Sequence, residues 1–248
     1  MSVAESVTYR QLTRMEELIR CSRIEHAIWG EGIVPPHLLR AVTHMGGLAV
    51  GAFADDELIG FVFGFRGVRP REGGEQQLHH SHVAAVLPDW RGRGVGVRLK
   101  RAQAQLCLEQ GLELMTWTFD PLRARNAHLN LEKLGATVSV YEPMYYGKMF
   151  DAQNGQLDSD RLLAEWQLTG STARFDGDTA IVPRALAAQP DGDPGPAKLE
   201  LTEAAVHVAV PRDLDNLLAS RPELAGSWRQ AVRQVMLHYL ERGYRAER

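Results

Sequence analysis

The chain has 248 residues, of which 44% are hydrophobic and 24% charged, the ordinary mix for a globular protein with one large domain, or one domain and a smaller appendage. Its formal net charge of −3 gives no reason to expect nucleic acid or an anionic membrane surface as a partner. Two cysteines are too few for a disulfide framework, the first residues lack a signal-peptide pattern and no apolar run approaches a membrane span, so we expect a cytoplasmic protein.

Helical and extended patterns alternate in the first part of the chain. A capping box at Thr13–Glu16 starts a helix that runs to about Ile28, and a short helix is expected at 37–44. Two segments rich in apolar and aromatic residues flank Ala54–Glu57 and are typical of a hairpin. The other elements predicted here are a strand at 8–12, hairpin strands at 48–53 and 58–65, a polar loop at 69–77 and a strand at 78–87.

The middle of the chain continues the alternation. Apolar residues at helical spacing predict a helix at 95–108, and Gly111 is typical of its end. A strand at 112–119, a short helix at 126–134 and a strand at 136–146 follow. The order β-α-α-β-β-β-α-β-α-β predicts an α/β sheet with helices packed on it.

The composition and pattern of the sequence change after about residue 170. Residues 187–198 carry three prolines and two glycines and are typical of a linker or long loop. Residues 199–210 look strand-like, and 223–241 form a strongly amphipathic helix pattern. We therefore expect a core domain at 1–170 and a C-terminal α+β extension at 171–248.

The most informative run extends from His82 to Leu99 and predicts a strand, a basic glycine-rich turn and the start of a helix. Gly92, Gly94 and Gly96 let the backbone approach a bulky anion, and the helix N-terminus adds partial positive charge. Further cations come from Arg91, Arg93, Arg98, Lys100 and Arg101. This construction suits a pyrophosphate.

The sequence excludes two common classes of pyrophosphate-binding site. The NTPase loop Gly-x-x-x-x-Gly-Lys-Ser/Thr is absent, and the dinucleotide fingerprint fails because position 97 is Val. The run Arg91-Gly-Arg-Gly94-Val-Gly96 after a strand, with a second helix beginning at Asn126, resembles the GNAT superfamily of coenzyme A-dependent N-acyltransferases over roughly residues 8–150.

The resemblance implies a mixed, mostly antiparallel twisted sheet flanked by helices. It also implies acetyl-CoA or succinyl-CoA as co-substrate and no metal. Backbone groups of Ala84 to Val86 are expected to pair with the pantetheine arm. The pyrophosphate is expected at 91–97, and Asn126 lines the far side of the arm. The residues assigned to the cofactor in this way are Ala84, Val86, Arg91, Gly92, Arg93, Gly94, Val95, Gly96, Val97 and Asn126.

The general acid cannot be carried over from the family. Many members have a tyrosine four residues before the Gly that ends the second helix, and here that position is Leu131. Tyr145 and Tyr146 are the favoured replacements, with Tyr141 a further candidate on the same predicted strand. The alternative is that each of them is a half-buried sheet aromatic.

Histidines suggest a general base. His79, His80 and His82 cluster on the strand expected beside the thioester, and His80 and His82 share one face. His82 is the candidate base and His80 a substrate contact, because an imidazole near pKa 6.5 can accept a proton. The alternatives are that the histidines bind a metal, for which no third or fourth ligand is obvious, or that they only pack in the fold. Glu25 and Glu31 are weaker candidates for the base.

Arginines beyond the core suggest how an acceptor could be held. Arg229 and Arg233 lie one helical turn apart and could grip a carboxylate together, and Arg161 is a third candidate. The alternative is pairing with Asp or Glu. The segment resembles a branch of the superfamily with a C-terminal extension, which implies succinyl-CoA and amino acids.

We therefore expect an N-acyltransferase that moves an acetyl or succinyl group to a primary amine of a small molecule, in a possible homodimer. The alternatives are a protein or peptide N-acetyltransferase, or a catalytically impaired regulator that binds coenzyme A.

Overall fold

The computed structural model describes residues 6–30, 34–147, 157–170 and 174–248. These residues fall into two compact units. Unit 1 comprises Met1–Trp117 and Trp166–Gly170, and unit 2 comprises Thr118–Glu165 and Ser171–Arg248. The boundary therefore cuts strands β5 (Leu114–Phe119) and β7 (Arg161–Gln167), while the domain boundary expected near residue 170 stays a prediction. No helix in the described ranges is long and apolar enough to cross a membrane.

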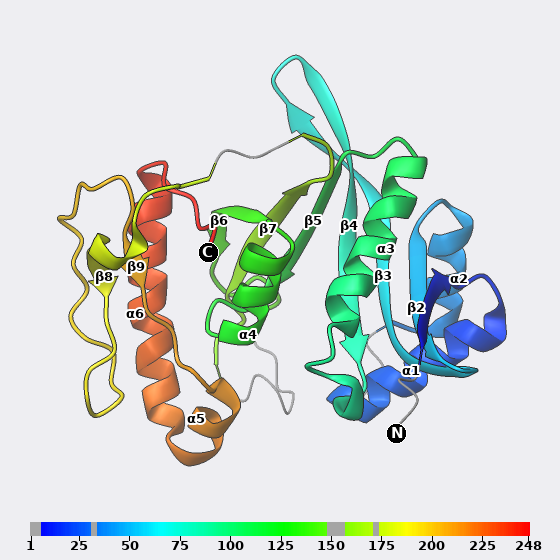
Figure 1. The fold of residues 1–248 in the computed structure, drawn as a ribbon, viewed down its shortest axis with the longest axis horizontal. Helices are drawn as coiled ribbons and strands as arrows, with labels where there is room; N and C mark the ends of the chain where they lie inside the picture. Colours follow the sequence, from blue (N-terminus) through cyan, green and yellow to red (C-terminus); the bar gives the residue numbers. More distant parts are fainter. Residues whose placement is uncertain (1–5, 31–33, 148–156, 171–173) are drawn as a thin grey trace. The chain divides into compact units, whose positions relative to one another are not determined.

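The predicted α/β class is confirmed. Seven strands form one sheet in the order β1-β2-β3-β4-β5-β7-β6, and Figure 1 labels β2 to β7. Pairing is antiparallel from β1 to β4 and between β6 and β7, and parallel between β4 and β5. The remaining bounds in this sheet are β1 Val7–Gln11, β2 Leu48–Ala54, β3 Glu57–Arg71, β4 Gly74–Val86 and β6 Thr137–Glu142.

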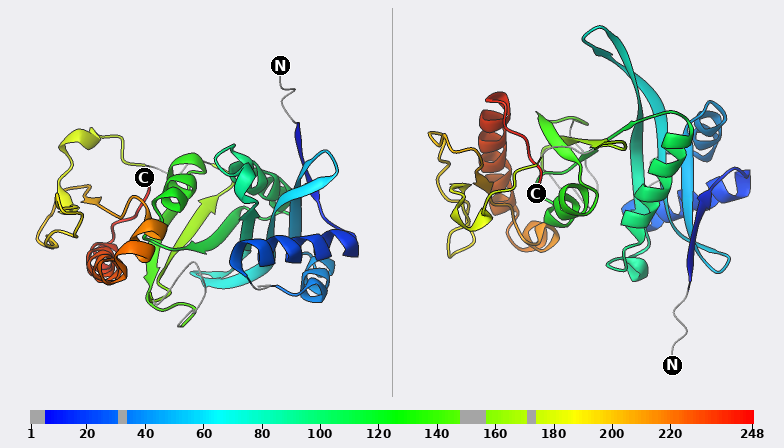
Figure 2. Two further views of the ribbon diagram at one scale, coloured as in Figure 1. Left: turned by 90° about the horizontal axis from the view of Figure 1, so that it is seen from below. Right: turned by 45° about the horizontal axis from the view of Figure 1, so that its top comes forward.

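Unit 1 buries apolar side chains on both faces of its strands. Helices α1 (Met15–Trp29) and α2 (Pro36–His44) supply Leu18 and Leu39 to one face, where they meet Phe61. Helix α3 (Val95–Glu109) covers the other face, where Leu99 meets strand residues such as Val62. Figure 2 shows α3 on the side of β2 and β3 opposite to α1 and α2. The sheet is thus held rigidly from both sides.

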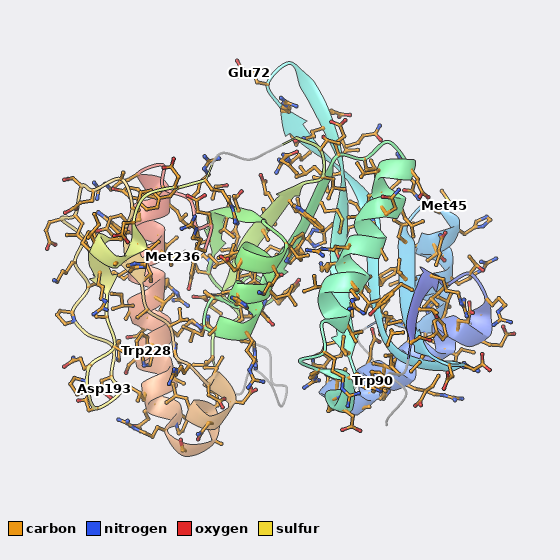
Figure 3. The ribbon with its side chains drawn as sticks, in the orientation of Figure 1. Met45, Glu72, Trp90, Asp193, Trp228 and Met236 are labelled. Atoms are coloured by element: carbon orange, nitrogen blue, oxygen red, sulfur yellow. The ribbon has the colours of Figure 1, made fainter. Side chains whose placement is uncertain are left out.

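The polar loop predicted at 69–77 is wrong, because β3 and β4 continue through it as a hairpin. Arg69 pairs with Gln76 in the strand register, and its side chain donates two 3.1 Å hydrogen bonds to that amide. The turn lies at Glu72 and Gly73, labelled at Glu72 in Figure 3, where Gly73 has a φ of 83°. The charged and amide residues that indicated a loop are cross-strand partners on an exposed ribbon.

A bulge interrupts β4 at one residue. Gly64 of β3 lies opposite Ser81 and Phe63 lies opposite Val83, so His82 is the extra residue. On its other side, β4 pairs with β5 only at His79 and His80 in the part of the chain that the structure describes. From Ser81 to Val86, the edge of β4 that would face β5 therefore carries no strand pairing among the described residues.

Unit 2 corrects two predicted bounds. Strand β6 ends at Glu142, before Pro143, so Tyr145 and Tyr146 lie in a turn and not on the strand predicted at 136–146. The helix predicted at 126–134 is a short α4 (Ala124–Ala127) followed by a π-helical turn, η2 (His128–Lys133).

The C-terminal segment packs on one long helix. The predicted amphipathic helix is confirmed as α6 (Pro222–Glu241), which follows α5 (Leu214–Ser220). Residues 187–198 form hydrogen-bonded turns beside α6, where Trp228 Nε1 donates to the Gly192 carbonyl at 3.0 Å. The strand predicted at 199–210 is wrong except for β9 (His207–Val208), which pairs with β8 (Arg184–Leu186). Figure 1 shows α6 between β8 and β6.

Candidate active site

The glycine-rich turn joins β4 to α3 through a short 3-10 helix, η1 (Pro88–Trp90). Gly92 and Gly94 have φ of 76° and 80°, a region that L side chains rarely adopt, and a Cβ added at either would meet no atom within 4 Å. Open space above two glycines is the cradle that a bulky anion needs. The predicted turn geometry at these two positions therefore fits a pyrophosphate.

Charge around the turn favours an anion. No side chain caps the N-terminus of α3 among the described residues, and its first turn holds no acidic residue, so backbone N–H groups stay available. Arg91 Nε donates to the Val86 carbonyl at 3.0 Å, and the Arg93 guanidinium lies 4.9 Å from the ring centroid of Trp90, labelled in Figure 3. Both arginines are exposed beside the turn.

Of the other predicted cofactor residues, Val95 is buried, whereas Gly96 and Val97 are half-buried in the first turn of α3. Ala84 is exposed and Val86 half-buried on β4 beyond the bulge, where the strand edge is unpaired within the described residues. Asn126 belongs to unit 2, where it is exposed on α4. The structure thus brings the predicted residues of 84–97 together in unit 1.

Three rings gather on β3 and β4 beside the bulge. The Phe65 ring centroid lies 5.3 Å from that of His80 and 6.0 Å from that of His82, and the two imidazoles are 6.3 Å apart. His80 Nδ1 lies 3.0 Å from Thr116 Oγ1. Desolvation, with help from His82 and Lys100, lowers the pKa of His80 to about 4, so His80 is neutral at pH 7.

His82 differs from the two histidines before it. It is exposed, and its imidazole has no hydrogen-bond partner in the described part of the chain. Partial desolvation lowers its pKa below the usual value, so a nitrogen lone pair is available at pH 7. His79 is fully buried against Gly64, and burial lowers its pKa to about 3. His82 is therefore the histidine best suited to accept a proton.

The candidate acids differ in exposure. Tyr145 and Tyr146 are 46% and 41% exposed and meet edge to face, with centroids 4.7 Å apart. The Tyr146 hydroxyl lies 3.1 Å from Thr118 Oγ1. Tyr141 is buried and donates to Asp160 at 2.6 Å, so its hydroxyl is already committed. Of the three candidate acids, Tyr145 and Tyr146 are thus the exposed ones, and their role as acids stays a prediction.

The arginines predicted to hold an acceptor are paired with carboxylates inside unit 2. Arg229 donates to both oxygens of Asp120, at 2.9 and 2.8 Å, and both side chains are buried. Arg233 binds Asp158 and Asp160, and Arg161 donates to the Asp160 backbone carbonyl at 2.8 Å. These contacts favour the alternative of structural ion pairs, and the acceptor role stays a prediction.

Sequence reasoning missed a buried lysine. Lys100, counted above among the cations for the anion, is only 4% exposed and donates to Ser81 Oγ at 2.7 Å. Its position one residue after the core residue Leu99, with Gln103 and Cys107 at helical spacing, was the available signal.

Two further predictions concern acidic residues and metals. Glu25 is buried and accepts the Val34 N–H at 3.1 Å, while Glu31 lies outside the described residues. Within the described ranges, no group of three or more His, Cys, Asp or Glu side chains could hold a metal ion.

Comparison with known proteins agrees with this geometry. The model of the acetyltransferase (GNAT) family matches residues 13–136, which are half of the chain. A search of curated proteins gave no match. The solved structure of yncA from Salmonella typhimurium with its cofactor acetyl-CoA is similar at 19% identity and a TM-score of 0.52, covering 69% of this chain and 99% of that one.

A second similar structure is the ribosomal-protein-S18-alanine N-acetyltransferase from Escherichia coli, at 14% identity and a TM-score of 0.52, covering 68% of this chain and 99% of that one. At these identities, both likenesses establish the fold. The family model adds the type of enzyme. The chain therefore belongs to the acetyltransferase (GNAT) family and is, at that level, an acyl-CoA-dependent N-acetyltransferase.

Proposed function

We propose that the protein transfers an acetyl or succinyl group from coenzyme A to a primary amine of a small molecule. One observation carries the proposal. The unpaired edge of β4 begins beside His82 and leads directly to the open glycine turn at Gly92 and Gly94. A strand edge can pair with the amides of the pantetheine arm, and the turn can hold the pyrophosphate. Asn126 is the candidate contact on the far side of the arm.

The proposed chemistry uses His82 as general base. Its imidazole takes the proton of the attacking amine, directly or through a water, and the amine nitrogen forms a bond to the thioester carbonyl carbon. A backbone N–H of β4 between Ala84 and Val86 stabilises the oxyanion. The carbon–sulfur bond then breaks, and the thiolate leaves. Because a thiol has a pKa of about 8.5, an acid assists this step without being essential.

Tyr145 or Tyr146 is the proposed proton donor to that thiolate. Both hydroxyl-bearing side chains are exposed, whereas Tyr141 is bound to Asp160 and Leu131 replaces the family tyrosine. Desolvation raises the pKa of Tyr145 above its usual value, so its hydroxyl is protonated at neutral pH.

The proposed acceptor is a small-molecule amine such as an amino acid. An amino acid would need an arginine for its carboxylate, for which Arg161, Arg229 and Arg233 are the predicted candidates. His80, whose ring centroid lies 6.3 Å from that of His82, is the candidate substrate contact beside the proposed base. The similar Escherichia coli enzyme is named for a protein alanine amine, which supports a peptide acceptor as the second candidate. A regulator that binds coenzyme A without turnover is the third, supported by Leu131. A cytoplasmic location and a homodimer stay predictions.

The test is turnover with acetyl-CoA and succinyl-CoA against panels of amino acids, other small amines and peptides, following free thiol. Thiol release that depends on a small amine, and is lost in His82→Ala, would support the proposal. Release with peptides alone would favour the second candidate. Tight coenzyme A binding without release for any acceptor would refute the enzyme and leave the regulator.

A further inference from the structure

A buried polar cluster lies where α3 packs on β4. Lys100 Nζ donates to Ser81 Oγ at 2.7 Å, and Ser81 Oγ donates to Gln103 Oε1 at 2.7 Å. Lys100 and Gln103 are three residues apart, so they project from the same side of the helix. All three residues are at most 4% exposed. Two side chains of the helix therefore hold one hydroxyl of the strand.

The place of this cluster in unit 1 is informative. Ser81 directly precedes the bulge residue His82 and directly follows His80, the last residue of β4 paired with β5. On the helix side, Lys100 lies in the second turn after Gly94. The hydrogen bonds therefore join the helix that starts at the anion turn to the point where β4 acquires its bulge and its free edge.

Lysine is a costly residue for this position. Among the residues that the structure describes, the titratable groups coupled to Lys100 are His79 and His80 of β4 and Cys107 of α3, and none of these three is a carboxylate. The Trp117 ring, with its centroid 4.0 Å from Nζ, closes another side. Burial without a counter-charge lowers the pKa of Lys100 to about 7. Locally unfavourable residues of this kind are concentrated at functional sites.

We propose that Lys100 is a positioning residue: together with Gln103 it fixes Ser81, and thereby sets the bulge that places the His82 imidazole for acyl transfer. This role rests on the proposed function, because it acts through the proposed base. It assigns Lys100 no contact with substrate. Replacing Lys100 is expected to slow the chemical step and not to weaken binding of the pyrophosphate.

A double-mutant cycle tests the role. Lys100→Met keeps an unbranched apolar side chain and removes the donor, while Ser81→Ala removes its acceptor. We expect each to lower kcat about tenfold or more, with the Kd for acetyl-CoA within about twofold of wild type. Because both act through the same hydrogen bond, the double variant should be no slower than Ser81→Ala. Gln105→Met, on the exposed side of α3, is the control.

Two outcomes of the cycle would overturn the inference. One is a kcat for Lys100→Met equal to that of the control. The other is a double variant whose loss is the product of the two single losses, because that would indicate independent packing effects. If Lys100→Met does not fold, Ser81→Ala, which removes a single oxygen atom, carries the same test of kcat against Kd.

A second readout does not require turnover. The imidazole resonances of His82 in NMR spectra should move in Lys100→Met and Ser81→Ala and stay in place in Gln105→Met. If the wild type releases no thiol with any acceptor, the proposed function fails, and these resonances still decide whether Lys100 sets the bulge. Unmoved His82 resonances in both variants would refute the positioning role of Lys100. The proposed acyl transfer would not be affected by that result.

Discussion

Replacing Arg229 separates a structural ion pair from an acceptor contact. In Arg229→Met, the guanidinium that binds both oxygens of Asp120 at 2.9 and 2.8 Å disappears. The Asp120 carboxylate keeps the Leu122 N–H at 2.8 Å but loses its paired cation. The two side chains are only 3% and 6% exposed, so water cannot replace the cation well. Breaking a buried pair from one side costs about 3–5 kcal/mol.

The measurement is chemical denaturation of the full chain. Unfolding of unit 2 is monitored by the fluorescence of Trp228, which directly precedes Arg229 on α6. A loss of about 3–5 kcal/mol lowers the folding equilibrium constant by roughly two to three and a half powers of ten. Asp120→Asn combined with Arg229→Met should recover at least half of this, because no buried charge is left unpaired.

The matched control breaks an exposed ion pair in the same unit. Arg221→Met removes the pair with Asp193, whose side chains are 52% and 42% exposed, and should cost less than about 1 kcal/mol. If Arg229→Met costs no more than this control and instead raises the KM for a carboxylate-bearing acceptor, the structural reasoning is refuted and Arg229 is an acceptor ligand.

Three further predictions concern unit 1. Burial lowers the pKa of Lys100 from 10.5 to about 7. Between these two pH values the unfolded chain binds more protons than the folded one, so the free energy of unfolding should rise with pH by a few kcal/mol. Denaturation at several pH values should show no such rise for Lys100→Met, and a rise equal to that of the wild type would count against a buried lysine. His82→Ala should lower kcat/KM by about 10²–10⁴ with unchanged acetyl-CoA affinity in calorimetry, and wild-type activity should fall as pH drops below the lowered pKa of His82. An added Cβ at Gly64 would clash with His79 Nε2 and the His80 carbonyl, so Gly64→Ala should cost about 1–3 kcal/mol in thermal unfolding, and a neutral result would refute this packing.

The glycine-rich turn and helix α6 could be predicted from the sequence. The basic turn from Arg91 to Gly96 is contiguous, and its glycines have an immediate steric meaning, so a glycine-rich turn between a strand and a helix could be predicted; in the structure, Gly92 and Gly94 adopt positive φ there. Helix α6 was found because its apolar residues repeat at helical spacing over five turns. Features that depend on neighbouring residues in one segment were therefore predictable.

Features that depend on distant partners were not. Arg229 meets an aspartate 109 positions earlier in the chain, and no pattern around α6 shows it. The bulge at His82 exists only in the register between β3 and β4. Lys100 looked like one more cation of a basic run, because a one-dimensional pattern does not show that its side chain points under β4. Burial and pairing decide these roles, and both come from the tertiary fold.

We expect the glycine turn at Gly92 and Gly94 to bind the pyrophosphate of an acyl-CoA. Gly94→Glu places a carboxylate in the open cradle, at a position with a φ of 80° where any side chain is strained. Gln105→Glu makes a similar charge change on the exposed side of α3 and is the control. Isothermal titration calorimetry with acetyl-CoA, on variants with wild-type circular dichroism, should show at least about a 100-fold loss of affinity for Gly94→Glu alone. An affinity equal to that of the control would contradict the assignment of this turn as the donor site.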